Sequence, residues 1–148
     1  MNRRALHQLL LIVAAAVASP LGLAAGPTVV TVYKSPACGC CSQWVEHLRN
    51  SGFEVKTIDT NDLGNIKSAA GVTPALASCH TAWVDGYLIE GHVPPKDIRR
   101  LLKEHPAVKG LTVPGMPSGA PGMDAPNPEH YKVLAIDADG KTTVFAEH

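Results

Sequence analysis

Three of the four cysteines of this 148-residue chain lie within four positions, in the segment Cys38-Gly39-Cys40-Cys41. The β-branched run before it, Val29 to Tyr33, predicts a buried strand. The apolar positions after it have the i, i+3, i+4, i+7 spacing of an amphipathic helix, namely Cys41, Trp44, Val45 and Leu48. Gly52 is placed to end this helix. We therefore expect the cysteines at a junction where a strand leads into a helix.

The next segments alternate between strand and helix patterns. Residues 53–58 predict a second strand, and residues 63–70 predict a short helix that Gly71 ends. Asp85-Gly86 between two apolar runs predicts a β-hairpin. Pro94-Pro95 then opens a helix that His105-Pro106 closes. The order βαβαββα predicts an α/β fold, a thioredoxin-like mixed sheet flanked by helices.

The C-terminal part of the chain has a different character. Residues 112–128 are rich in Pro and Gly, which predicts a long loop, and they contain Met116 and Met123. Residues 131–136 and 142–146 predict a further hairpin added to the sheet. With 45% hydrophobic and 18% charged residues, the composition is that of a folded chain. Thirteen basic and thirteen acidic side chains leave no positive excess, so we expect no nucleic-acid partner.

The N-terminus has the pattern of a secretory signal peptide. Arg3 and Arg4 precede the apolar run 9–17, and small residues end the segment at Ala24 and Ala25. The alternative is a membrane anchor, which needs about 20 apolar residues, but Ser19-Pro20 interrupts the run. We predict a cleaved signal peptide over residues 1–25, a single domain over 26–148, a periplasmic location and no stable membrane insertion after cleavage. Outside the cytosol, exposed thiols oxidise unless a reductant or a metal protects them.

The cysteine cluster admits a purely structural and a redox interpretation. As crosslinks, most pairings would close loops inside residues 38–41, and such short loops add little stability. As a thiol-disulfide oxidoreductase, the protein would cycle Cys38 and Cys41 between dithiol and disulfide, with Pro74 as the candidate cis-proline facing them. Cys40 is awkward for this activity, because a third thiol permits scrambled pairs.

A metal site makes use of the third thiol. The free backbone amides and the dipole at a helix N-terminus favour thiolates, which bind soft metals. Cys79 would join them if the sheet brings it to the end of the first strand. Thiolates with thioethers nearby favour Cu(I), although four thiolates also suit zinc, which would make the protein a zinc-stabilised structural domain.

The histidines and methionines are weaker candidates. A methionine in a loop more often packs than binds a metal, but Met116 and Met123 share the context Pro-Gly-Met. His80 and His92 flank the predicted hairpin and are plausible additional ligands. We assign no metal-binding role to His105, His130 and His148.

Several segments together resemble one known family. They are Cys38-Gly39-Cys40-Cys41 with Trp44 and His47-Leu48, Ser78-Cys79-His80-Thr81-Ala82, Gly86-Tyr87, Glu90-Gly91-His92-Val93-Pro94, Val113-Pro114-Gly115-Met116-Pro117 and Pro121-Gly122-Met123. This set resembles the periplasmic copper-resistance proteins called CopG, which are thioredoxin-like. It spans residues 29–123 and is far more specific than a C-x-x-C pair alone.

The resemblance implies a protein of copper resistance or homeostasis that binds copper, with redox activity as a further expectation. Carried over by position, it makes Cys38, Cys40, Cys41 and Cys79 the thiolate ligands, and His92, Met116 and Met123 match further motifs of the family. We expect Cu(I), in one ion or in a multinuclear thiolate cluster, with copper ions and other periplasmic copper-handling proteins as partners. If the protein is an enzyme, we expect a copper- or thiol-based oxidoreductase in which Cys38 and Cys41 are catalytic.

Overall fold

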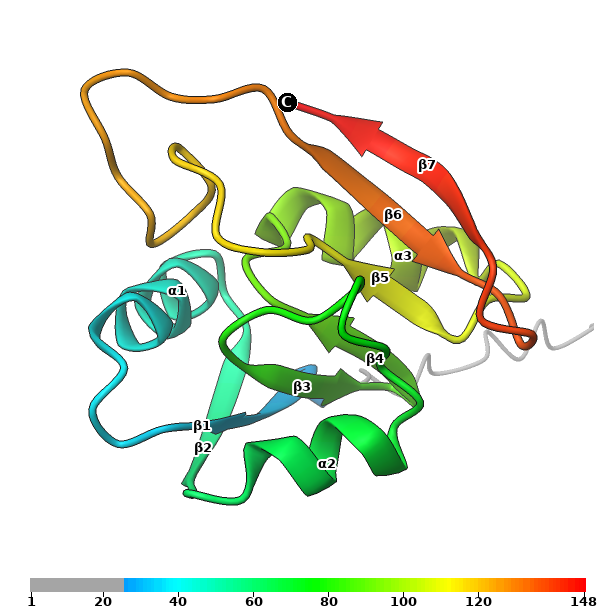
Figure 1. The fold of residues 1–148 in the computed structure, drawn as a ribbon, viewed down its shortest axis with the longest axis horizontal. Coiled ribbons are helices and arrows are strands. Elements are labelled where there is room, and N and C mark those ends of the chain that lie inside the picture. Colours follow the sequence, from blue (N-terminus) through cyan, green and yellow to red (C-terminus); the bar gives the residue numbers. More distant parts are fainter. Residues whose placement is uncertain (1–25) are drawn as a thin grey trace, which may run out of the picture.

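A computed structural model describes residues 26–148, so the predicted signal peptide lies outside the described residues. These residues form seven strands and three helices (Figure 1). The strands are β1 (Val29–Lys34), β2 (Glu54–Asp59), β3 (Thr81–Val84), β4 (Tyr87–Glu90), β5 (Gly110–Thr112), β6 (Lys132–Ile136) and β7 (Thr142–Glu147). The helices are α1 (Gly39–Asn50), α2 (Leu63–Ala69) and α3 (Pro95–Glu104).

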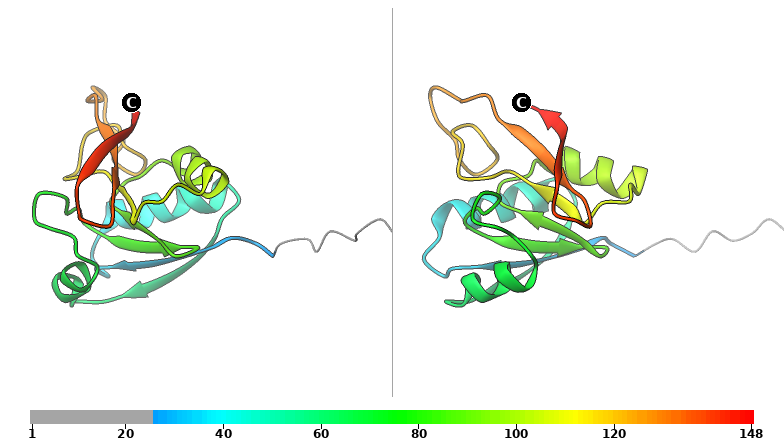
Figure 2. Two further views of the ribbon diagram at one scale, coloured as in Figure 1. Left: turned by 90° about the vertical axis from the view of Figure 1, so that its right-hand side faces the viewer. Right: turned by 45° about the vertical axis from the view of Figure 1, so that its right-hand side comes forward.

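All seven strands belong to one mixed sheet, in the order β2-β1-β3-β4-β5-β6-β7. β1 pairs with β2 and β4 with β5 in parallel, and the other neighbours are antiparallel. Helices α1 and α3 lie over one face of the sheet and α2 lies over the other (Figure 2). The predicted βαβαββα order of the first seven elements and the thioredoxin-like α/β class are confirmed.

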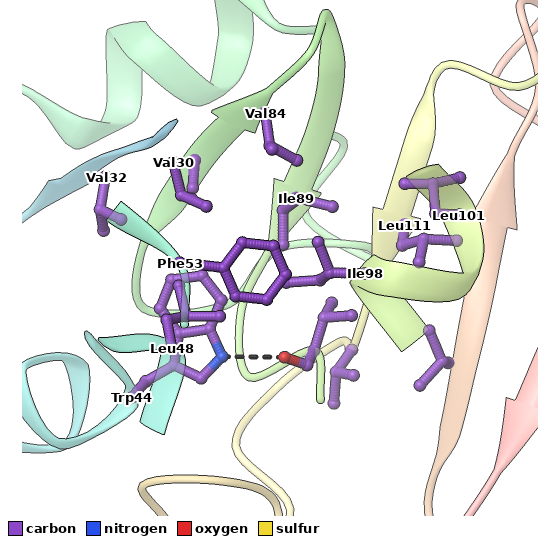
Figure 3. Close-up of a cluster of buried hydrophobic side chains, with 14 of the residues drawn as sticks. Val30, Val32, Trp44, Leu48, Phe53, Val84, Ile89, Ile98, Leu101 and Leu111 are labelled. Atoms are coloured by element: carbon purple, nitrogen blue, oxygen red, sulfur yellow. Dashed lines mark hydrogen bonds between the residues drawn. The ribbon is translucent and has the colours of Figure 1, made fainter. Parts of the chain in front are cut away.

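The main core lies between the sheet and helices α1 and α3 (Figure 3). Alternate strand residues point into it, among them Val30 and Val32 of β1, because side chains alternate between the two faces of a strand. Trp44 of α1 is fully buried, and its indole Nε1 donates a hydrogen bond to the Val93 carbonyl at 2.9 Å. This bond attaches α1 to the segment that leads from β4 into α3.

The β3–β4 turn has the backbone conformation that Asp85-Gly86 predicts. Asp85 and Gly86 both have positive φ, 47° and 80°, as the two central residues of a type I′ hairpin turn require. The C-terminal hairpin is also present, as β6 and β7. Residues 113–131 contain no helix or strand, which agrees with the loop predicted there.

The structure differs from the sequence predictions in three details. Helix α1 begins at Gly39, two residues before its apolar pattern, because Cys38 caps it by accepting a hydrogen bond from the Cys41 amide. Strand β5 was not predicted. The prediction of a cis-proline at Pro74 is wrong, because residues 26–148 contain no cis peptide bond. Pro74 is exposed in a turn that is closed by a hydrogen bond from the Leu76 amide to the Thr73 carbonyl.

Among the described helices, none has the length and apolarity to cross a membrane.

Candidate metal centre

One half of the centre is built by the first turn of α1. Cys38 is the N-cap residue and Cys40 and Cys41 follow inside the turn, so three sulfur atoms project from one short segment. Cys38 and Cys41 form a disulfide, and Cys40 is a free, half-buried thiol whose Sγ lies 3.5 Å from Cys38 Sγ. The helix N-terminus therefore presents one disulfide and one free thiol at the same place.

The other half of the centre comes from the segment before β3. β3 runs antiparallel to β1 with Tyr33 opposite Thr81, so the residues that precede Thr81 meet the end of β1 where the cysteine segment begins. This register brings the free thiol of Cys79 to 3.9 Å from Cys40 Sγ. The four sulfur atoms all lie within 4.8 Å of one another. The structure thus brings together all four predicted thiolate ligands.

His92 joins the centre because β4 pairs with β3 and ends beside Cys79. Its Nε2 lies 3.0 Å from Cys79 Sγ, and its Nδ1 lies 2.7 Å from the Pro121 carbonyl oxygen. A carbonyl oxygen only accepts hydrogen bonds, so Nδ1 carries the proton and Nε2 presents its lone pair to the sulfur. This arrangement fixes the imidazole in the tautomer that a metal ion at the cysteines needs.

His80 lies deeper than His92. It is fully buried, its Nδ1 lies 3.4 Å from Cys79 Sγ, and its ring packs at 4.3 Å from the Trp44 ring. Within the described part of the chain, its Nε2 has no hydrogen-bond partner. Cys79, His80 and His92 form a second group of three potential metal donors that shares Cys79 with the first.

Burial sets the protonation of these groups. Burial first, and the neighbouring Cys40 second, raise the pKa of the Cys79 thiol to about 11. Burial also lowers the pKa of His80, to about 3, and lowers the pKa of His92. Both imidazoles are therefore neutral at neutral pH, the form that binds a metal.

A helix N-terminus favours thiolates, but this effect does not keep Cys79 ionised. Cys79 lies across from the helix, so burial dominates its pKa, and the metal-free thiol is protonated at neutral pH. A metal ion must displace this proton when it binds, as is usual for thiolate sites.

The Pro/Gly/Met-rich loop lies against both halves of the centre. Next to Met116, Gly115 accepts a hydrogen bond from Ser78 Oγ at 2.5 Å and donates one to the Ala77 carbonyl. Next to Met123, Gly122 lies so close to α1 that a Cβ atom there would come within 2.8 Å of the Cys40 carbonyl oxygen. Met116 is 52% exposed, so packing does not account for it, and Met123 is half-buried.

Comparison with known proteins gives three results. Residues 76–123 match a family described as "Protein of unknown function, DUF411", a segment that contains Cys79, His92 and both loop methionines. No protein with a curated description matches the chain.

Two solved structures match over most of the chain. Both are described as copper resistance protein CopG, in two forms, and both are 39% identical to this sequence. The similarity covers 82% of this chain and 98% of each of the other two, with TM-scores of 0.79 and 0.78. On this identity and coverage, the chain belongs to the CopG family of copper resistance proteins.

Proposed function

We propose that the protein is an exported, periplasmic copper-resistance protein that holds Cu(I) at Cys38, Cys40, Cys41 and Cys79, with His92 as a nitrogen ligand. The convergence of four sulfur atoms and one correctly oriented imidazole is the observation that carries this proposal. Thiolate and imidazole donors suit both copper and zinc, but the two methionines on the loop that lies against the centre favour Cu(I). Met116 and Met123 are proposed as additional thioether ligands on this ground, and membership of a copper-resistance family supports copper as the cargo.

The oxidation state of the cysteines sets how much copper the centre holds. With Cys38 and Cys41 joined in a disulfide, the thiols left for metal binding are Cys40 and Cys79. Reduction of the disulfide takes up two electrons and two protons and returns two more thiols. The reduced protein is therefore expected to bind more Cu(I), and in a multinuclear form if a sulfur atom bridges two ions.

An anaerobic Cu(I) titration of both redox forms tests the proposal. Reduced protein and protein with the Cys38–Cys41 disulfide are titrated in parallel against a chromophoric Cu(I) chelator. We expect the reduced form to take copper from the chelator, and the disulfide form to bind fewer ions more weakly. If the reduced form leaves all the copper with the chelator, the proposed function is wrong.

A thiol-disulfide oxidoreductase is the second candidate. The disulfide in a C-x-x-C segment at a helix N-terminus favours it, because this is the form in which such an enzyme oxidises its partner. Cys40→Ser separates the two candidates: disulfide exchange by Cys38 and Cys41 survives the substitution, whereas a copper site that uses Cys40 loses affinity. Rapid reduction of a test disulfide, together with no tight copper binding, would put this candidate first.

A further inference from the structure

A buried carboxylate lies beneath the segment that carries Cys79. Glu90, the last residue of β4, is fully buried. Its Oε1 accepts hydrogen bonds from Lys67 Nζ at 2.6 Å and from the Ser78 amide at 2.7 Å, and its Oε2 accepts one from Thr81 Oγ1 at 2.7 Å. One side chain thus connects helix α2, the residue next to Cys79, and strand β3.

The backbone around Glu90 connects the remaining parts of the centre. The Val113 amide, at the start of the Pro/Gly/Met-rich loop, donates a hydrogen bond to the Glu90 carbonyl at 3.0 Å. Gly91 has φ +72°, and a Cβ atom there would come within 2.5 Å of the Ser78 side chain. His92 is the next residue. The segments that carry Cys79, His92 and the methionines therefore meet around Glu90.

Stability alone does not account for the buried ion pair between Glu90 and Lys67. Glu90 is fully buried and the Lys67 side chain is 15% exposed, so both charges have lost most of their hydration. Apolar replacements of such pairs are often as stable as the original, whereas one partner left alone is strongly destabilising. The Glu90 carboxylate fixes the orientation of the Ser78 amide by accepting its hydrogen bond, and Cys79 is the next residue.

We propose that Glu90 is a positioning residue of the metal centre, which holds the Ser78 amide so that Cys79 faces Cys40 and His92, with Lys67 as its counter-ion. This inference rests on the proposed function for its link to copper. Its structural part, the placement of Cys79, concerns this chain's own residues and is measurable without copper.

The test uses a double variant, a conservative variant and a matched control. Glu90→Leu with Lys67→Met removes both charges together, and Glu90→Gln keeps the shape but not the charge. Glu147→Leu with Lys132→Met makes the same substitutions at an exposed ion pair between β7 and β6. The first readout is copper-free and uses the protein with the Cys38–Cys41 disulfide, in which Cys40 and Cys79 are the two free cysteines. A bifunctional bimane crosslinks these two thiols, whose sulfur atoms lie 3.9 Å apart, and fluoresces only when both have reacted.

The second readout is Cu(I) affinity with the copper–thiolate absorption band. We expect the Glu90/Lys67 double variant to lose most of the crosslinking, to bind Cu(I) about 10- to 100-fold more weakly and to shift the band. Glu90→Gln should recover part of both, and the Glu147/Lys132 variant should match the wild type.

The outcomes separate this inference from the proposed function. Wild-type crosslinking and affinity in a folded Glu90/Lys67 variant overturn the inference. If that variant does not fold, Glu90→Gln decides, and unchanged crosslinking with an unchanged absorption band overturns it equally. If the wild type binds no copper while crosslinking still depends on Glu90, the proposed function fails and the placement of Cys79 by Glu90 stands.

Discussion

The two halves of the candidate metal centre are built in different ways. The half at α1 is local: three cysteines occupy one cap and one helical turn, and the disulfide between Cys38 and Cys41 closes within that turn. The half that carries Cys79 and His92 depends on the register of β1, β3 and β4 and on a buried polar network. The first half therefore needs little beyond its own segment, whereas the second is sensitive to substitutions far from it in the sequence.

The largest effect is expected from Cys79→Ser, which removes the sulfur atom of the second half and leaves the first intact. Because it deletes a ligand rather than a residue that orients one, Cu(I) affinity should fall by more than about 100-fold. The Cys38–Cys41 disulfide should still form, and mass spectrometry of the oxidised protein checks this. Unchanged copper affinity would mean that the α1 half binds the metal alone.

Gly122→Ala tests how the loop fits against the α1 half. A Cβ atom at Gly122 would come within 2.7 Å of the Trp44 amide nitrogen, whereas one at Gly140 would meet nothing within 4 Å. Both glycines have nearly the same φ, +84° and +81°, so Gly140→Ala is a matched control. Chemical denaturation should show a loss of about 1 kcal/mol for the control and about 2 kcal/mol more for Gly122→Ala. Equal losses would show that the loop does not press on α1.

A smaller effect is expected from acid on the metal-free protein. Burial lowers the pKa of His80 from 6.5 to about 3 and also lowers the pKa of His92. As the pH falls below about 6.5, the unfolded chain takes up protons that the folded chain cannot, so stability is present above this pH and is lost towards pH 3. The melting temperature measured from pH 7 to pH 4 should fall, and His80→Phe should flatten the fall. His105→Asn, at an exposed histidine, is the control and should leave the slope as it is.

The smallest effect is expected on the outer surface of α1. Glu46 and Arg49 form an exposed ion pair at 2.7 Å, beyond the first turn of α1 that carries the cysteines. Such pairs contribute little because water screens them, so Glu46→Gln should change the free energy of unfolding by less than about 0.5 kcal/mol. Copper affinity should be the same as in the wild type. A clear loss of affinity would show that the α1 half is less self-contained than its geometry indicates.

The sequence predicts the fold well where apolar residues recur at the spacing of a helix or a strand. Helix α1 and the β3–β4 hairpin follow from apolar spacing and turn residues. The approach of Cys79 to the cysteine cluster was predicted only on the condition that the sheet brings it to the end of the first strand, and the register of β1 and β3 meets this condition. Strand β5 has only three residues, too few to show alternation. It begins at Gly110, where a Cβ atom would clash with the Leu88 backbone, a close approach that the sequence does not reveal.

The protonation state of Cys79 and the burial of Glu90 beneath the centre were harder to predict. A glutamate at the end of a hairpin strand looks like a solvated residue, and only the packing of α2 and the Ser78 segment makes Glu90 buried. The raised pKa of Cys79 likewise comes from burial, which spacing between cysteines does not encode. Pro74 was misassigned because Thr-Pro suits an ordinary turn as well as a cis bond.

The packing of Trp44 gives the protein a built-in optical reporter. Its indole lies against the His80 ring, next to the sulfur atoms, while Trp83 lies near Tyr33 with ring centroids 5.5 Å apart. The chain has two tryptophans in all, so its intrinsic emission divides between one fluorophore packed on His80 and one packed against a separate apolar cluster of Val72, Leu88 and Ile136. A heavy ion at the cysteines should quench Trp44 more than Trp83, so occupancy should be readable in unlabelled protein.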